Sequence, residues 1–261
     1  MTAPAAPEVL VERSDAGVVT LTLNRPQVKN AISSGMWEEL RRVFQEVTQN
    51  EADRVLVITG AGGDFCTGAD LSGVMTDGHP LNAMHPVTAT AIALNEVSKP
   101  VIAKVRGAAV GAGMNLALGC DLIVASQNAR FSEIFSRRAL SVDFGGTWLL
   151  PRLVGLHKAK ELAFFADVLS ASEAKEIGLV NRVVPDGELD AFVADWARRL
   201  AQGPTIALQM TKRMLASASS LSLAEALGWE ATAQAVNFAS SDTREGVTAF
   251  LEKRPPVFRG R

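Results

Sequence analysis

Hydrophobic residues follow two different spacings in the first half of the chain. Short apolar runs between polar or turn-forming residues are typical of buried β-strands, and they predict strands at residues 9–12, 18–23, 55–59 and 101–105. Between these runs, apolar residues recur every three or four positions, which predicts amphipathic helices at 33–49 and 87–97. Small residues at 113–118 also indicate a helix. This recurrence of strand and helix predicts an α/β fold.

The second half of the chain is mostly helical in pattern. After a last strand at 180–184 and a turn at Pro185–Gly187, apolar stripes predict helices at 188–202, 204–217, 223–238 and 242–252. A small appendage cannot cover all of these stripes, so the C-terminal helices are a candidate interface between protomers. We therefore expect a core at residues 1–195 and a helical region for oligomerisation at 196–261.

The composition and net charge of the chain exclude several classes of protein. The chain has 261 residues, of which 48% are hydrophobic, so it can bury one large core. A net charge of −2 argues against binding of nucleic acid or anionic lipid. No apolar run is long enough to span a membrane. The two cysteines, Cys66 and Cys120, favour reduced thiols and a cytoplasmic location. The histidines lack metal-ligand spacing, so no metal is expected.

Two short turns follow apolar strands and consist mostly of small residues. The first spans Phe65–Asp70 and the second spans Gly107–Gly113, just before the predicted small-residue helix. Such turns can direct backbone N–H groups at a ligand, and a helix start adds a favourable dipole for negative charge. The pair therefore predicts an oxyanion hole. The alternative is that glycine and alanine only allow close packing here.

These two turns, the Leu23–Pro26 and Asn30–Ala31 segments and the closing Phe250–Pro255 segment resemble the crotonase (enoyl-CoA hydratase/isomerase) family. The resemblance implies a spiral of ββα repeats with helices outside, and C-terminal helices that pack protomers into trimers or hexamers. It also implies an acyl-CoA substrate, whose CoA enters as part of the thioester, with no separate cofactor.

The resemblance further assigns roles to individual residues. The backbone N–H groups of Ala69 and Ala112 would hold the thioester oxygen. Residues of the matching segments would contact the substrate or its CoA: Lys29, Ala31, Gly68, Asp70, Leu71, Phe135, Phe250 and Lys253. Asp70 is expected mainly to fix its turn. Phe250 and Lys253 would share a helix face and contact the CoA nucleotide; alternatively, Phe250 lies in an interface and Lys253 is solvated.

Both glutamates of typical hydratases in this family are replaced. Asn115 and Phe135 occupy their positions, and neither side chain can accept and return a proton at neutral pH. The Asn115 amide can still orient a water or a substrate group, so Asn115 stays a candidate catalytic residue. Glu133 lies nearby, but on an extended segment it would sit one pleat from Phe135, too far to substitute simply. Hydration by paired glutamates is therefore not expected.

A carboxylate follows at Asp143, in the segment Asp143–Arg152, which resembles the isomerases of phenylacetate catabolism in this family. In family members that move a double bond, one acidic residue near this place removes a proton from one carbon and returns it to another. We expect Val142, Phe144 and Trp148 to bury Asp143 and raise its pKa. The alternative is that Asp143 caps the following helix.

The sequence thus predicts an enoyl-CoA isomerase with Asp143 as its base. Two alternatives stay open: a 2-enoyl-CoA hydratase that uses unusual residues, and an acyl-CoA-binding protein with little turnover.

Overall fold

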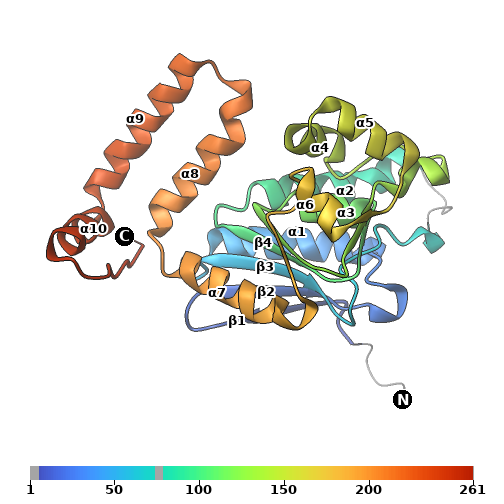
Figure 1. Ribbon diagram of the computed structural model, residues 1–261, viewed down its shortest axis with the longest axis horizontal. Coiled ribbons are helices and arrows are strands. Elements are labelled where there is room, and N and C mark those ends of the chain that lie inside the picture. The colour runs from blue at the N-terminus through green and yellow to red at the C-terminus, as the bar shows by residue number, and fades with distance from the viewer. Residues whose placement is uncertain (1–5, 74–78, 261) are drawn as a thin grey trace.

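A six-stranded sheet forms the centre of the computed structural model, which describes residues 6–73 and 79–260 (Figure 1). The strand order is β1-β2-β3-β4-β6-β9. Only the β1–β2 pair is antiparallel; the other four pairs are parallel. The strands are β1 (Val9–Arg13), β2 (Val18–Leu23), β3 (Val55–Gly60), β4 (Val101–Val105), β6 (Leu122–Ser126) and β9 (Arg182–Val184).

Both faces of this sheet are buried, which explains its continuous apolar strands. Because side chains alternate along a strand, Val55 and Val57 of β3 face α7 (Leu189–Ala201), whereas Leu56 and Ile58 join the larger core on the other face. The helix α1 (Ser34–Gln49) buries its predicted apolar stripe in that larger core, and Ser33 caps it through the Met36 N–H.

A second, three-stranded sheet in the order β5-β7-β8 lies beyond the ends of the first. It contains β5 (Ala108–Val110), β7 (Arg130–Ser132) and β8 (Leu169–Ser170). Strand β4 leads directly into β5 and then α3 (Ala112–Leu118), and β6 likewise leads into β7. β4 and β6 are thus each followed directly by a short strand of the second sheet, and β5 leads into the start of α3.

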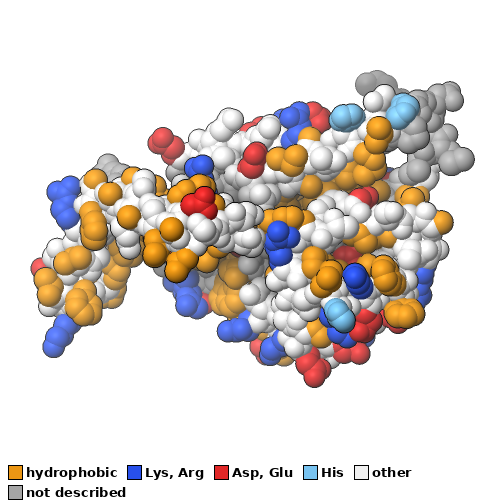
Figure 2. Space-filling view, turned by 90° about the horizontal axis from the view of Figure 1, so that it is seen from above, with side chains coloured by type: hydrophobic (Ala, Val, Ile, Leu, Met, Phe, Trp, Pro, Cys, Tyr) orange, Lys and Arg blue, Asp and Glu red, His pale blue; other side chains and the backbone are white. Residues whose placement is uncertain are grey.

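The remaining helices form two groups. One group packs around the core: α2 (Pro80–Asn95), α4 (Gly146–Val154), α5 (Leu156–Phe165) and α6 (Ala171–Glu176). The other extends away from the sheets as an arm, with hydrophobic side chains along its surface (Figures 1 and 2): α8 (Thr205–Ser217), α9 (Leu223–Ala239) and α10 (Ser241–Glu252).

The α/β class predicted from the sequence is confirmed, with three local differences. The second helix begins at Pro80, not at 87, because His79 caps it and proline is favourable in a first turn. The three short strands of the second sheet were not predicted. The expected division between 195 and 196 falls inside α7, which packs on the sheet, so the arm begins only after Ala201.

Candidate active site

Main-chain pairing holds the two predicted turns side by side. Cys66 forms a parallel bridge with Ala109 of β5, and its carbonyl accepts from the Val110 N–H at 2.9 Å. The approach is close: a Cβ at Gly68 would lie 3.3 Å from the Ala112 nitrogen, and one at Gly113 would lie 2.3 Å from the Cys66 oxygen. Gly68 also has a φ of +91°, which favours glycine. The packing and ligand-binding explanations for these glycines are therefore compatible.

Pairing with Ile32 sets the direction of the Ala69 N–H, and the start of α3 leaves the Ala112 N–H without a partner in the helix. Ile32 donates to the Gly68 carbonyl at 2.8 Å and accepts from the Asp70 N–H at 2.8 Å, so the intervening Ala69 N–H points away from Ile32. Ala112 is the first residue of α3, where helix N–H groups have no partner within the helix. Among the described residues, neither N–H has a hydrogen-bond acceptor. Two free donors on adjacent turns can stabilise one anionic oxygen.

The segment before α1 supports the first turn. The Lys29 carbonyl accepts from Thr67 N–H at 3.2 Å, so residues 29–32 lie along 67–70. Arg25 joins the segments by donating to the Ala31 carbonyl at 2.8 Å and to the Asp70 carboxylate at 2.9 Å. Hydrogen bonds from Ser72 and Arg25 lower the pKa of Asp70 to about 2, so this side chain is ionised and fixes the turn.

These contacts bring the predicted substrate residues of the two segments together: Lys29, Ala31, Gly68, Ala69, Asp70 and Leu71. The Lys29 and Leu71 side chains are exposed, and the Lys29 Nζ atom lies 4.0 Å from the Asp64 carboxylate.

Asn115 lies three residues after Ala112 and is completely buried. Its side-chain NH₂ donates to the backbone carbonyl of Asp143 at 2.9 Å and to the Glu133 carboxyl at 3.4 Å. Because both neighbours are acceptors, the NH₂ must face them. The amide also packs against Gly146, where a Cβ would approach it to 2.4 Å. From the middle of α3, Asn115 therefore ties this helix to the segment at Glu133 and to the loop at residues 143–146.

Asp143 does not cap the following helix. The N-cap of α4 is Gly145, which has no side-chain bond, and the Asp143 Oδ1 atom is buried with no hydrogen-bond partner among the described residues. Burial raises the pKa of Asp143 to about 6. Trp148 contributes less than expected, because it is 41% exposed and packs on Arg152. The carboxyl is free to exchange a proton near neutral pH.

Glu133 corrects an expectation from the sequence. Its segment is not extended: it precedes the short 3-10 helix η3 (Ile134–Arg138), which separates its side chain from that of Phe135. Glu133 is only 1% exposed, and its Oε1 atom has no hydrogen-bond partner among the described residues. Burial, with a smaller contribution from the charge of Asp143, raises its pKa to about 8. Phe135 instead packs beside Gly111, 3.7 Å from the position of an added Cβ.

The location of Glu133 near the second turn follows from the backbone pairing of its neighbour Ser132. Ser132 ends β7 and its carbonyl accepts from Gly111 N–H at 2.8 Å, which places residue 133 next to the second turn. The strand is too short for periodicity to reveal this contact.

Phe250 and Lys253 lie far from this cluster. Helix α10 is at the far end of the arm, whereas α3 and α4 lie over the core (Figure 1). Phe250 is 81% exposed, and Lys253 ends the helix in a left-handed conformation with φ of +56°. The predicted shared helix face is therefore wrong for Lys253. Within one chain, neither residue reaches the candidate site.

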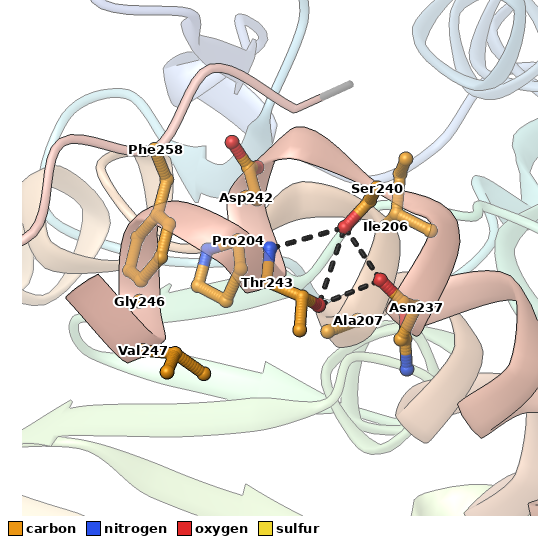
Figure 3. Close-up of a pocket in the computed structure, with 10 residues that line it drawn as sticks. All are labelled: Pro204, Ile206, Ala207, Asn237, Ser240, Asp242, Thr243, Gly246, Val247 and Phe258. Atoms are coloured by element: carbon orange, nitrogen blue, oxygen red, sulfur yellow. Dashed lines mark hydrogen bonds between the residues drawn. The ribbon is translucent and has the colours of Figure 1, made fainter.

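A hollow between the arm helices is not part of the site. The Ser240 and Thr243 hydroxyls that line it both donate to the Asn237 carbonyl (Figure 3). The two oxygen–oxygen distances are 2.7 and 2.6 Å. Asp242 accepts the Arg259 and Gly260 N–H groups at 2.7 and 2.8 Å, which fastens the C-terminal tail. The side chains of Ser240, Asp242 and Thr243, which line this hollow, are thus already hydrogen-bonded within the protein.

Other kinds of site receive no support from the part of the chain that the structure describes. Across residues 6–73 and 79–260, no three His, Cys, Asp or Glu side chains are grouped as metal ligands would be. In the same ranges, no helix has the length and hydropathy to cross a membrane. Burial raises the pKa of Cys66 to about 12, so this thiol is not a ready nucleophile.

Several known proteins are similar to this chain in sequence and in fold. The enoyl-CoA hydratase/isomerase family matches residues 13–261. The 1,2-epoxyphenylacetyl-CoA isomerase of Escherichia coli is 38% identical over 97% of this chain and 99% of its own. The crotonyl-CoA hydratase of Syntrophomonas wolfei is 35% identical over 96% and 98%. The crystal structure of an enoyl-CoA hydratase from Bacillus anthracis has a TM-score of 0.93, 33% identity and coverage of 98% and 100%.

These similarities extend over nearly the whole chain and include both sequence and fold. The crotonase fold expected from the sequence is thereby confirmed, and the chain is a member of the enoyl-CoA hydratase/isomerase family.

Proposed function

We propose that this enzyme is an enoyl-CoA isomerase that moves a double bond through an enolate of the thioester, with Asp143 as its base. The observation that carries the proposal is the position of Asp143: a half-buried side chain whose buried Oδ1 atom has no hydrogen-bond partner among the described residues, on a loop that Asn115 ties to the helix presenting the Ala112 N–H. The substrate is an acyl-CoA, and the CoA enters as part of it.

The reaction begins with proton removal from a carbon activated by the thioester. The Asp143 carboxylate takes the proton, and negative charge develops on the thioester oxygen. The Ala69 and Ala112 N–H groups stabilise that oxygen, and losing one such donor typically costs about 3–4 kcal/mol in the transition state. Protonation of a second carbon then shifts the double bond. With its pKa raised to about 6, Asp143 is a stronger base than an ordinary aspartate and is still mostly ionised at neutral pH.

Hydration of a 2-enoyl-CoA is the second candidate function. Glu133 favours it, because hydratases of this family use two carboxyl groups and Glu133 supplies a second one beside Asn115. Against it, Asn115 and Phe135 occupy the positions of the usual glutamates.

The test is to give the purified enzyme 3-hexenoyl-CoA and 2-hexenoyl-CoA in parallel. We expect conversion of the 3-enoyl to the 2-enoyl thioester to exceed water addition to the 2-enoyl thioester. Faster hydration would support the second candidate, and tight binding with neither reaction would indicate an acyl-CoA-binding protein.

We also propose that the protein assembles as a trimer or a dimer of trimers. Large apolar side chains are exposed along all three arm helices, among them Leu215, Leu223, Phe238, Phe250 and Leu251. Packing against a second copy would cover them. It would also allow Phe250 and Lys253 of one protomer to approach the CoA bound to another. We expect this assembly to work in the cytoplasm, where the free thiols of Cys66 and Cys120 stay reduced.

A further inference from the structure

The cluster around Asn115 contains two carboxyl groups, whereas a simple proton shuttle needs only one. Three of its atoms are buried without a hydrogen-bond partner among the described residues: Asn115 Oδ1, Glu133 Oε1 and Asp143 Oδ1. Buried polar atoms are rarely left unpaired, because each costs about 1–3 kcal/mol. Three together, beside a pair of free N–H donors, indicate groups kept available for a ligand.

Glu133 is close to the oxyanion turn as well as to Asp143. The Ser132 carbonyl bonds to Gly111 N–H at 2.8 Å, and Gly111 directly precedes Ala112. The Asn115 NH₂ binds the Glu133 carboxyl and the Asp143 backbone together. Glu133 and Asp143 therefore lie on two segments that both contact Asn115, three residues after Ala112.

We propose that Glu133 is a second catalytic residue, which donates the proton that the enolate receives while Asp143 holds the proton removed. This inference rests on the isomerase proposed above. In the forward step a C2–H bond of the 3-enoyl thioester breaks and an O–H bond forms on Asp143. The Glu133 O–H bond then breaks and a C4–H bond forms, which leaves the double bond at C2–C3. Before the next turnover Asp143 must release its proton to solvent and Glu133 must take one up from solvent.

The charge state of the pair fits these roles. The charged group that acts on Glu133 is Asp143, and its polar neighbour is Asn115. With a pKa of about 8 for Glu133 and about 6 for Asp143, one proton resides on the pair near pH 7, chiefly on Glu133. The base is then ionised and the acid is neutral before substrate binds.

The two mechanisms differ in the fate of the removed proton. If Asp143 acts alone, deuterium taken from C2 can be returned to C4 of the same molecule. If Glu133 donates, the label stays on Asp143 and is lost to solvent during the reset. The test therefore uses 3-hexenoyl-CoA with deuterium at C2, in ordinary water, with mass spectrometry of the product.

We expect the wild-type enzyme to place little deuterium at C4. The Glu133→Gln enzyme keeps an acceptor for Asn115 but has no acidic proton, so we expect about 10²–10³-fold slower isomerisation and a several-fold larger fraction of label at C4. We expect a fall in the wild-type kcat/KM above about pH 8, where Glu133 loses its proton, and we expect the Gln variant to lack that fall. The exposed Glu176→Gln change on α6 is the matched control and should alter neither readout.

Extensive label at C4 in the wild-type product would overturn the role of Glu133, even if the Gln variant failed to fold. An unchanged label and pH profile in Glu133→Gln would do the same and leave Glu133 as a structural partner of Asn115. In either case the proposed isomerase function would be unaffected. That function would be contradicted only if the wild-type enzyme did not convert 3-hexenoyl-CoA.

Discussion

The side-chain NH₂ of Asn115 donates to the backbone carbonyl of Asp143 at 2.9 Å. This bond fixes the loop before α4 relative to α3, and thus the carboxyl group of Asp143 relative to the N–H of Ala112. Asn115 occupies a usual catalytic position but cannot carry a proton. It still serves the site, because it positions Asp143, which can carry one.

Asn115→Ala should accordingly weaken folding and slow the reaction only moderately. Removing the amide leaves the Asp143 carbonyl and the Glu133 carboxyl without this donor, so we expect a loss of about 1–3 kcal/mol in the free energy of unfolding. Isomerisation should fall less than in Asp143→Asn. Urea denaturation and steady-state kinetics check both expectations; a larger kinetic loss than in Asp143→Asn would place the chemistry at Asn115.

The oxyanion hole can be tested at Ala112 without changing a functional side chain. Ala112→Pro removes the N–H, and proline is tolerated at the first position of a helix, so folding should survive while isomerisation falls by about 10²–10³-fold. Ala112→Gly keeps the donor and should be mild. Circular dichroism confirms folding of both proteins, and equal kinetic losses in the two would indicate that packing is the real constraint.

The raised pKa of Asp143 predicts a stability gain when its charge is removed. Burial disfavours the ionised carboxyl in the folded state, so the folded protein binds the proton more tightly than the unfolded chain. Stability is therefore lost as pH rises from about 4 through about 6. Asp143→Asn should be more stable than wild type at pH 8, by about 1–3 kcal/mol, and nearly equal at pH 4. A destabilised variant at pH 8 would contradict the burial of a charged Asp143.

Lys253 is the candidate contact for the 3′-phosphate of CoA. If a protomer's Lys253 reaches the CoA of its neighbour, Lys253→Ala should weaken acyl-CoA binding more than acyl-dephospho-CoA binding, because only the former carries that phosphate. Calorimetry on protein of unchanged oligomeric state makes the comparison. The same loss for both ligands would exclude this contact.

Spacing alone predicted the long elements well. The stripe of α1 and the runs of β2 and β4 are continuous enough for hydrophobic periodicity to define them. The strands of the second sheet have only two or three residues, and long-range pairing, not local pattern, creates them. For the same reason Glu133 was misplaced: its position depends on the Ser132–Gly111 bond and on the turn of η3.

The resemblance of the turns supplied Ala69 and Ala112, and neither N–H group has a hydrogen-bond acceptor within residues 6–73 and 79–260. It could not supply the tie between Asn115 and Asp143, because that contact joins a helix to a loop 28 residues away.

The most direct test of the account is the isomerisation rate of Asp143→Asn. The change keeps the shape of the side chain and removes its basicity. Asp15→Asn, at an exposed position in the loop between β1 and β2, is the matched control. With folding and CoA binding intact, we predict a kcat/KM for isomerisation of 3-hexenoyl-CoA about 10²–10⁴-fold below wild type, and wild-type values for Asp15→Asn. Turnover near the wild-type rate in Asp143→Asn would remove Asp143 from the mechanism.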